Sequence, residues 1–274
     1  MSKILECVPN ISEGRDAAVI DAVVGVLDMV DVLNVESDRD HNRTVITFVG
    51  DPDDVVEGAF RLVEKAAELI DMGSHKGVHP RLGAADVLPL VPLVGLKMEE
   101  VVEMARDLGR RITAELGVPV YMYEKAALIE ERANLAEVRK NGGEPDFGGE
   151  IGSAGVSVVG ARDILVAYNV NLKSLDLGIA KEIARRVRKI PSLKALGLML
   201  KECAQVSMNL VNYRETNMSD AFAAVEEAAK KLGVEVLESE LIGLAPQKAF
   251  GERDLLLKNF SEEKVLDLRI SHTL

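Results

Sequence analysis

The segment 71–83 (DMGSHKGVHPRLG) carries the side chains of this chain that are best suited to proton transfer and anion binding. It combines two histidines with a lysine and an arginine, and after Asp71 no acid occurs until Asp86. The chain as a whole is acidic, with a formal net charge of -12 at pH 7. An acid-free segment with two cations and two imidazoles is therefore predicted to form a local anion pocket.

His79 is the predicted proton-transfer residue of this segment. Pro80 favours an extended backbone at His79, and Gly77 permits a sharp turn before it, so a stiff loop should present the imidazole. An unperturbed imidazole has a pKa of roughly 6.5, which suits general acid–base catalysis near neutral pH. A purely structural histidine is the alternative interpretation of the same pattern.

The spacing of His75 and His79 also resembles half of a metal site. However, Gly77 weakens any helix between the two histidines, and no third ligand is evident nearby. The metalloprotease pattern requires a glutamate directly after the first histidine, where Lys76 stands. The sequence therefore predicts that this segment binds no metal.

Three other polar segments could orient or bind a ligand. The expected turn 36–41 (ESDRDH) is rich in carboxylates, which suits either a solvated turn or a carboxylate that orients His79. The segments 168–171 and 205–209 place amide side chains on expected strands. Those amides either form the polar face of an alternating strand or recognise a ligand with hydrogen-bonding groups.

Hydrophobic periodicity predicts the order β-α-β-β-α-β twice along the chain. This order indicates an α+β fold with two tandem ferredoxin-like (split βαβ) subdomains, each an antiparallel sheet with helices on one face. The first copy has expected strands at 3–9, 31–36, 43–50 and 85–91, and helices at 16–29 and 53–70. The second copy has expected strands at 163–172, 194–200, 203–213 and 234–242, and helices at 176–189 and 218–232.

The residues between the two copies set the expected domain boundary. A helix at 97–115 and a strand at 118–122 follow the first copy, whose last strand should be short or at an edge because it contains Pro89. Residues 141–160 hold seven glycines, which predicts a linker without a helix or a central strand. We therefore expect subdomains at 1–160 and 161–274, with a ligand cleft between them.

The composition argues against several classes of protein. The negative net charge disfavours binding to nucleic acids and to anionic membranes. No apolar run reaches the roughly 20 residues of a membrane-spanning helix, and the N-terminal residues lack the apolar core of a secretory signal. Only two cysteines occur, so a disulfide framework is excluded and a cytoplasmic location is expected.

The chain also contains several long and chemically unusual runs of residues. They are ECVPNISEGR (6–15), NRTVITFVG (42–50), LIDMGSHKGVHPRLGAADVLPLVP (69–92), LGVPVYMYEKAA (116–127), PDFG (145–148), GAR (160–162), YNVNL (168–172), QVSMNL (205–210) and ELIGLAP (240–246). Together and in this order, they resemble the formiminotransferase domain of the glutamate formiminotransferase (formimidoyltransferase) family. The resemblance covers nearly the whole chain.

The resemblance implies two α/β subdomains with a folate cleft between them, and no cyclodeaminase domain. It implies transfer of the formimino group from N-formimino-L-glutamate to N5 of tetrahydrofolate, a step of histidine degradation and one-carbon metabolism. It also implies that His79, in the motif GVHPR, is the catalytic acid–base. An aspartate ahead of the NRT motif assists in the animal members; here the aligned position is Glu36, with Asp38 and Asp40 nearby.

Tetrahydrofolate is thus the expected co-substrate, and no metal or nucleotide cofactor is expected. Relatives that use formylglutamate, formiminoglycine or 5-formyltetrahydrofolate are the closest alternatives, and a non-catalytic folate-binding protein is another. Apolar strand edges make a homodimer the expected assembly. The expected contacts with folate and glutamate, including cations for their carboxylates, are Asn10, Arg43, Lys76, Arg81, Asn169, Asn171, Ser207 and Asn209.

Overall fold

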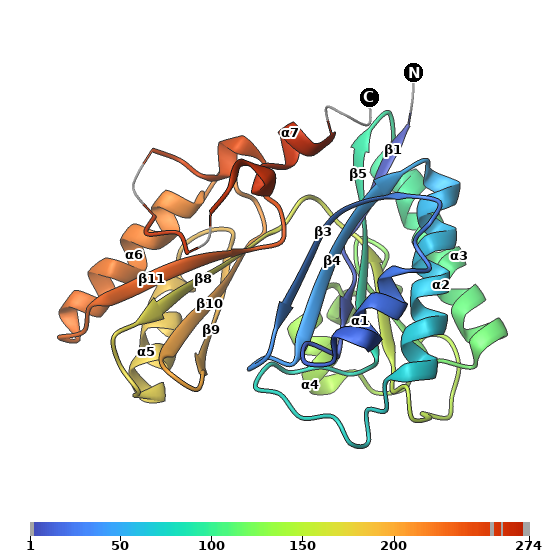
Figure 1. The fold of residues 1–274 in the computed structure, drawn as a ribbon, viewed down its shortest axis with the longest axis horizontal. Helices are drawn as coiled ribbons and strands as arrows, with labels where there is room; N and C mark the ends of the chain where they lie inside the picture. The colour runs from blue at the N-terminus through green and yellow to red at the C-terminus, as the bar shows by residue number, and fades with distance from the viewer. Residues whose placement is uncertain (1–2, 253–254, 259, 271–274) are drawn as a thin grey trace. The chain divides into compact units, whose positions relative to one another are not determined.

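The computed structural model describes residues 3–252, 255–258 and 260–270, and Figure 1 shows their helices and strands. The chain divides into two compact units, the first ending at Arg162 and the second beginning at Asp163. Each unit has its own sheet and its own hydrophobic core, which confirms the predicted α+β class. Within the described residues, no helix is both long enough and apolar enough to cross a membrane.

The first unit consists of a mixed sheet and its covering helices. Its strands are β1 (Ile4–Cys7), β2 (Asn10–Ile11), β3 (Asp31–Asp38), β4 (Arg43–Gly50), β5 (Ala85–Val94), β6 (Val120–Glu124) and β7 (Ser157–Ala161). Its helices are α1 (Ala17–Val24), α2 (Pro52–Leu69), α3 (Met98–Leu116) and α4 (Leu135–Asn141), with a 3-10 helix at Glu130–Ala133.

The pairing of these strands places β5 in the middle of the sheet. Strands β1 and β2 both lie between β4 and β5 and are antiparallel to them, while β3 pairs with the other edge of β4. On its far side, β5 pairs in parallel with β7, which pairs in parallel with β6. The strands of the expected first copy are therefore antiparallel to one another, as predicted. Strands β6 and β7 add parallel pairs that were not predicted, so the sheet as a whole is mixed.

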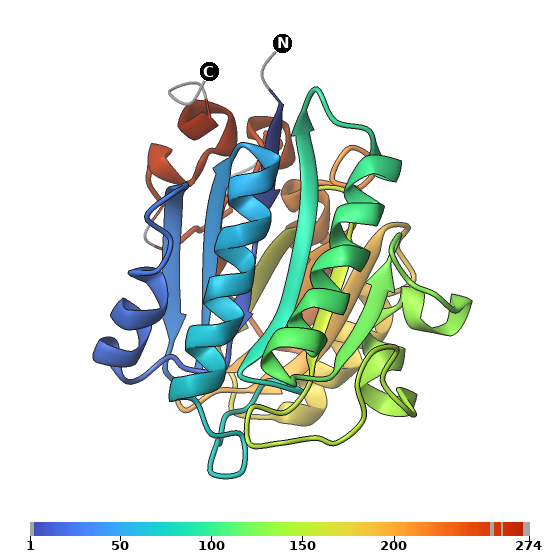
Figure 2. The same cartoon turned by 90° about the vertical axis from the view of Figure 1, so that its right-hand side faces the viewer.

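Helices α2 and α3 lie side by side over one face of this sheet (Figure 2), where their apolar residues enclose the main core. Helix α2 begins where the sequence provides capping groups: Asp51 accepts the Asp53 N–H at 3.1 Å, and Pro52 occupies the first helical turn. It ends before Ile70, so the histidine-bearing segment 71–83 is the connection from α2 to β5.

Pro89 lies inside the ten-residue strand β5, which corrects the prediction of a short or edge strand. Its carbonyl accepts the Val8 N–H at 3.2 Å. The nitrogen and the carbonyl of one strand residue point to the same edge, so the missing donor of Pro89 faces Val8 and Pro9. Those two residues form the interruption between β1 and β2, where regular pairing is absent in any case.

The glycine-rich segment 141–160 contains more regular secondary structure than predicted, because its last residues form most of β7. This strand lies between β5 and β6, so the prediction that the segment contains no central strand is wrong. Gly160 is suited to this place because a Cβ there would overlap the ring of Tyr123. The absence of a side chain therefore permits close packing in the sheet at this position.

The second unit has a four-stranded sheet of order β11-β8-β10-β9, in which all pairs are antiparallel. Helices α5 and α6 contribute to its hydrophobic core. Its elements are β8 (Val166–Leu172), α5 (Leu177–Val187), β9 (Leu193–Met199), β10 (Ala204–Leu210), α6 (Met218–Lys231), β11 (Val236–Ile242), two 3-10 helices (Gln247–Ala249 and Glu262–Lys264) and α7 (Leu266–Ile270).

Candidate active site

The segment 71–83 lies against the turn 39–42 that joins β3 to β4. The side-chain amide of Asn42 donates to the backbone carbonyl of Lys76 at 3.0 Å, and the backbone carbonyl of Asn42 accepts from Nε2 of His75 at 3.1 Å. The Val78 N–H donates to the carbonyl of Asp40 at 3.2 Å. These contacts bring together two segments of the chain that are each rich in polar groups.

Gly77 allows this close approach, because a Cβ at its position would overlap the carbonyl oxygen of His41. Arg81 then fixes the shape of the segment from within. Its guanidinium donates to the carbonyl of His79 at 2.9 Å and to the carbonyl of Gly77 at 3.2 Å. Arg81 therefore holds the backbone on both sides of Val78, and its predicted role as a cation for substrate stays a prediction.

The imidazole of His79 has one nitrogen engaged by the backbone. Its Nδ1 lies 2.8 Å from the carbonyl oxygen of Pro80. Because a carbonyl only accepts, this contact assigns the proton of the neutral ring to Nδ1 and leaves the lone pair on Nε2. The ring of His41 lies beside it, with the ring centroids 5.7 Å apart.

The surroundings of His79 favour its neutral form. His79 is half-buried, and the protein atoms packed around its ring lower its pKa well below the usual 6.5. The charges of Arg43 and Arg139 and the proximity of His41 lower the pKa further, and the hydrogen bond to Pro80 opposes them weakly. A neutral imidazole with a free Nε2 is able to act as a base at neutral pH.

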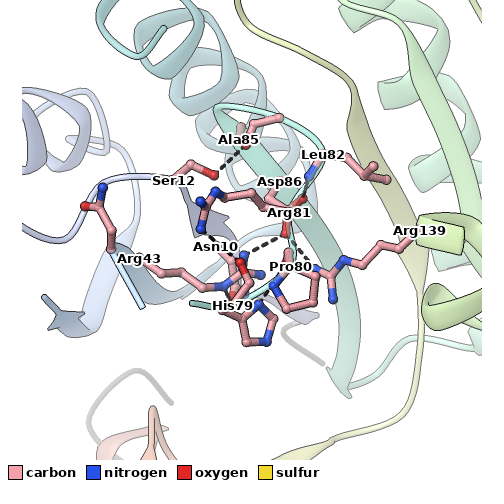
Figure 3. Close-up of polar contacts among 12 residues, drawn as sticks. Asn10, Ser12, Arg43, His79, Pro80, Arg81, Leu82, Ala85, Asp86 and Arg139 are labelled. Atoms are coloured by element: carbon pink, nitrogen blue, oxygen red, sulfur yellow. Dashed lines mark hydrogen bonds and ion pairs between the residues drawn. The ribbon is translucent and has the colours of Figure 1, made fainter. Parts of the chain in front are cut away.

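Asp86 organises the cations next to this imidazole. It is fully buried on β5, and its Oδ2 lies 2.7 Å from Nη1 of Arg43 and 2.6 Å from Nη2 of Arg139. Its Oδ1 accepts the Leu82 N–H at 2.6 Å, which ties the end of the histidine-bearing segment to the strand. In Figure 3 the two arginines approach Asp86 from opposite sides, with the ring of His79 beside them.

The ion pairs keep Asp86 charged despite its burial. Burial alone would raise the pKa of its carboxyl, but the charges of Arg43 and Arg139 and the Leu82 N–H lower the pKa to about 2. Burial lowers the pKa of Arg43, and the positive charges of Arg139 and Arg81 lower it further. The negative charge of Asp86 and its hydrogen bond raise this pKa. An arginine nevertheless stays protonated in proteins, so the cluster holds two guanidiniums and one carboxylate.

Two of the predicted substrate-binding residues of the first unit meet in this cluster. Nε of Arg43 donates to Oδ1 of Asn10 at 2.8 Å.

The other predicted residues of the first unit lie on neighbouring segments. Lys76 is exposed on the loop. Glu36 is half-buried on β3, where it pairs with Val45, and its predicted role as an assistant of His79 stays a prediction. Of the neighbouring acids, Asp38 accepts the backbone N–H of His41 at 2.7 Å.

The predicted residues of the second unit lie on the face of its sheet that points away from α5 and α6. Tyr168 and Val170 pack in the core of the unit, so Asn169 and Asn171, which alternate with them on β8, point to the opposite face. Both asparagines are 3% exposed. Their amides donate to carboxylates of β11, Asn169 to Glu240 at 3.4 Å and Asn171 to Glu238 at 3.2 Å.

The same face continues on β10. Gln205 donates to Oδ1 of Asn171 at 2.9 Å and is fully buried. Ser207 is half-buried and Asn209 is exposed, so exposure increases along the strand. Asn169, Asn171 and Gln205 thus form a connected polar network with Glu238 and Glu240 within the second unit.

The sequence analysis missed three residues of the cluster around His79: His41, Asp86 and Arg139. An acid within the apolar run ADVLPLV was the available signal for Asp86, because a lone carboxylate in a buried strand requires a partner. Arg139 offers no such signal, since it is 53 positions from Asp86 and lies in a strongly charged segment.

Among the described residues, no group of three or more His, Cys, Asp or Glu side chains could hold a metal ion.

The fold and the site define an α+β protein with a base-competent histidine in a cationic setting. Comparison with models of protein families identifies the family to which the chain belongs. Residues 4–162 match the formiminotransferase domain, N-terminal subdomain, and residues 167–254 match the formiminotransferase domain. The chain belongs to the formiminotransferase family.

Several curated proteins are similar to this chain over most of its length. A glutamate formimidoyltransferase of Thermoplasma acidophilum is 43% identical over 97% of both chains. One from Streptococcus pyogenes serotype M1 is 44% identical over 91% of both. A formimidoyltransferase-cyclodeaminase of Sus scrofa is 41% identical, matching 91% of this chain and 51% of its own.

Proposed function

We propose that this protein is a glutamate formimidoyltransferase, which transfers the formimino group from N-formimino-L-glutamate to N5 of tetrahydrofolate in histidine degradation. Family membership and the similarity to two glutamate formimidoyltransferases over nearly their full length support the reaction. The observation that carries the mechanism is the contact of Nδ1 of His79 with the Pro80 carbonyl, which leaves Nε2 for proton transfer. Burial and the charges of Arg43 and Arg139 lower the pKa of this ring and so favour its neutral form. His79 is the catalytic acid–base in this proposal.

The proposed reaction needs one proton carrier. The folate N5 attacks the amidine carbon of the donor, and a new C–N bond gives a tetrahedral intermediate. Nε2 of His79 takes the proton from N5 and then delivers it to the nitrogen of glutamate, as the C–N bond to that nitrogen breaks. The products are 5-formiminotetrahydrofolate and glutamate, and His79 returns to its neutral form.

A direct assay tests this proposal. The protein is incubated with tetrahydrofolate and, in separate reactions, with N-formimino-L-glutamate, formylglutamate or formiminoglycine, while the folate spectrum is followed. Turnover with formiminoglutamate well above the other donors supports the proposal. Preferred use of another donor, or consumption of 5-formyltetrahydrofolate in a separate reaction that contains it alone, would assign the chain to a related one-carbon reaction. Folate binding without turnover of any donor would indicate a binding protein.

The proposed mechanism uses no metal, so we expect chelation to leave the rate unchanged. His75 and His79 lack a third ligand among the described residues, and each ring has a nitrogen in contact with a backbone carbonyl. The test compares kcat before and after dialysis against EDTA, with the metal content measured in both samples. Loss of activity that a single divalent ion restores would contradict the metal-free mechanism.

The low pKa of His79 predicts the pH dependence of the reaction. The ring must be neutral to accept a proton, so kcat/KM should fall with decreasing pH only as the lowered pKa is approached. The midpoint of this acidic limb should therefore lie below 6.5. Arg139→Gln removes a positive charge near the ring and should move the midpoint upward. A wild-type midpoint at or above 6.5 would contradict the proposed environment of His79.

We further propose roles for the other predicted residues. Glu36 assists His79, and Arg43, Lys76 and Arg81 bind carboxylates of glutamate or of folate. Asn10 and the polar side chains of the second unit contact the folate. The polar network of that unit supports this assignment, since a pterin is recognised through donors and acceptors. The residues proposed there are Asn169, Asn171, Ser207 and Asn209.

The finer architecture is also part of the proposal. We propose that residues 1–160 and 161–274 form two ferredoxin-like subdomains. In the second unit, the strand order β11-β8-β10-β9 and the order of elements support this classification. In the first unit, β7 and β6 extend the sheet beyond β5. We also propose a cytoplasmic homodimer. The presence of only two cysteines in the sequence supports the cytoplasmic location. Light scattering in solution tests the assembly.

A further inference from the structure

Several buried nitrogens near His79 have no hydrogen-bond partner among the described residues. Nε2 of His41 and Nε of Arg139 are two of them. The side chain of His41 is buried, with 8% of the residue exposed, and that of Arg139 is 14% exposed. A buried polar nitrogen without a partner is costly, so a ligand that accepts hydrogen bonds here would be favoured.

The same region carries an excess of positive charge. Arg43 and Arg139 share the single carboxylate of Asp86, and the charge of Arg81 also acts on Asp86 and Arg43. Of the acids on the adjoining segments, Asp38 accepts the backbone N–H of His41. Glu13 accepts the N–H groups of the three residues that follow it. Three guanidiniums therefore face one buried carboxylate in a protein of net charge -12.

We propose that Arg139, together with Arg43 and His41, binds the α-carboxylate of the amino-acid donor. This inference rests on the proposed function, because it identifies which part of the donor lies beside His79. The nitrogen that His79 protonates is bonded to the carbon that carries the α-carboxylate. When that nitrogen is within reach of Nε2 of His79, the α-carboxylate must lie close by, next to the excess cations.

This placement makes the α-carboxylate a requirement of the donor. The distal carboxylate of glutamate is separated from the leaving nitrogen by the side chain, so it binds at a different place. N-formimino-4-aminobutyrate lacks the α-carboxylate and keeps the distal one. It is therefore the informative comparison, since it removes one charged contact with Arg139 and leaves the reacting amidine unchanged.

The test is a cycle of two donors and two forms of the enzyme. In the wild type, kcat/KM for N-formimino-L-glutamate should exceed that for N-formimino-4-aminobutyrate by at least about 10-fold, the effect of one hydrogen bond between charged groups. In Arg139→Gln this preference should fall to within about 3-fold, mostly through KM, and Arg139→Lys should restore part of it. Arg111→Gln is the matched control, because Arg111 also pairs with a carboxylate, that of Glu57, on the helical surface.

The result that would overturn the inference is an equal loss for both donors in Arg139→Gln, which would show a structural role. An unchanged preference would overturn it as well. Failure of the proposed function gives a different result, namely that the wild type turns over neither donor.

Binding of the product provides a measurement that does not depend on turnover. By calorimetry, the wild type should bind L-glutamate at least about 10-fold more tightly than 4-aminobutyrate, and Arg139→Gln should remove that difference while Arg111→Gln retains it. Equal affinity of the wild type for both amino acids would contradict the α-carboxylate subsite even if the reaction proceeds as proposed.

Discussion

His79→Ala is expected to lower kcat at least ~100-fold, which is the usual contribution of a general acid–base group. The substitution removes the nitrogen that both accepts the N5 proton and protonates the leaving amine. Affinity for folate should stay nearly unchanged, because the hydrogen bond of the His79 ring goes to the carbonyl of the adjacent Pro80 and ties down no distant segment. Steady-state kinetics and the dissociation constant of a folate analogue measure the two effects separately.

His75→Ala is the matched control for this experiment. His75 lies on the same segment and contacts the carbonyl of Asn42, so its removal affects the docking of the segment against the turn 39–42. We expect a smaller loss of kcat than for His79→Ala. A larger loss at His75 would reverse the assignment of the two histidines. Equal losses of folate affinity and of rate in His79→Ala would indicate a structural histidine.

Most helices and strands could be predicted from the sequence because they carry a local signal, whereas β7 could not. Helix α2 illustrates this: Asp51 and Pro52 mark its start, and apolar residues at helical spacing face the core. The segment 71–83 was equally recognisable, since its glycines, its proline and its ionisable residues are contiguous. Local composition was sufficient to identify His79 as the candidate base.

Pro89 and the glycines of 141–160 show where local rules fail. A proline is tolerated in a central strand if its missing donor faces a break in the neighbouring strand, and here that break is at Val8 and Pro9. A glycine is tolerated if a large neighbour fills its space, as Tyr123 does at Gly160. Both conditions depend on strand pairing between residues far apart in sequence, which no local pattern reveals.

The cluster around Asp86 could not be predicted for the same reason. Asn10, Arg43 and Arg81 were all candidates, but nothing in the sequence indicated that Arg43 and Arg139 would share one carboxylate. Arg139 lies on the short helix α4, which packs over the face of the first sheet opposite to α2 and α3. That the tertiary arrangement places this arginine next to His79 follows only from the structure.

Asp86→Ala is expected to destabilise the first unit by about 3–5 kcal/mol, the range for removing one partner of a buried ion pair. The substitution leaves Arg43 and Arg139 close together without their shared carboxylate, and it removes the acceptor of the Leu82 N–H. Hydrogen exchange in urea, read from peptides of residues 4–94, measures the free energy of unfolding of this unit specifically.

Asp107→Ala provides the surface control, because Asp107 pairs with Arg110 on α3 and both side chains are more than half exposed. Exposed pairs contribute about 0–1 kcal/mol, so this variant should unfold almost like the wild type.

The pH dependence of the effect of Asp86→Ala gives a second criterion. The pKa of Asp86 is lowered from 3.8 to about 2, so the carboxylate stabilises the fold above pH 3.8 and loses this effect as the pH falls through 2. The difference in stability between wild type and Asp86→Ala should therefore be largest at neutral pH and should shrink below pH 3.8. A difference under about 1 kcal/mol at neutral pH, similar to that of Asp107→Ala, would show that Asp86 does not hold the two arginines and the histidine-bearing segment in place.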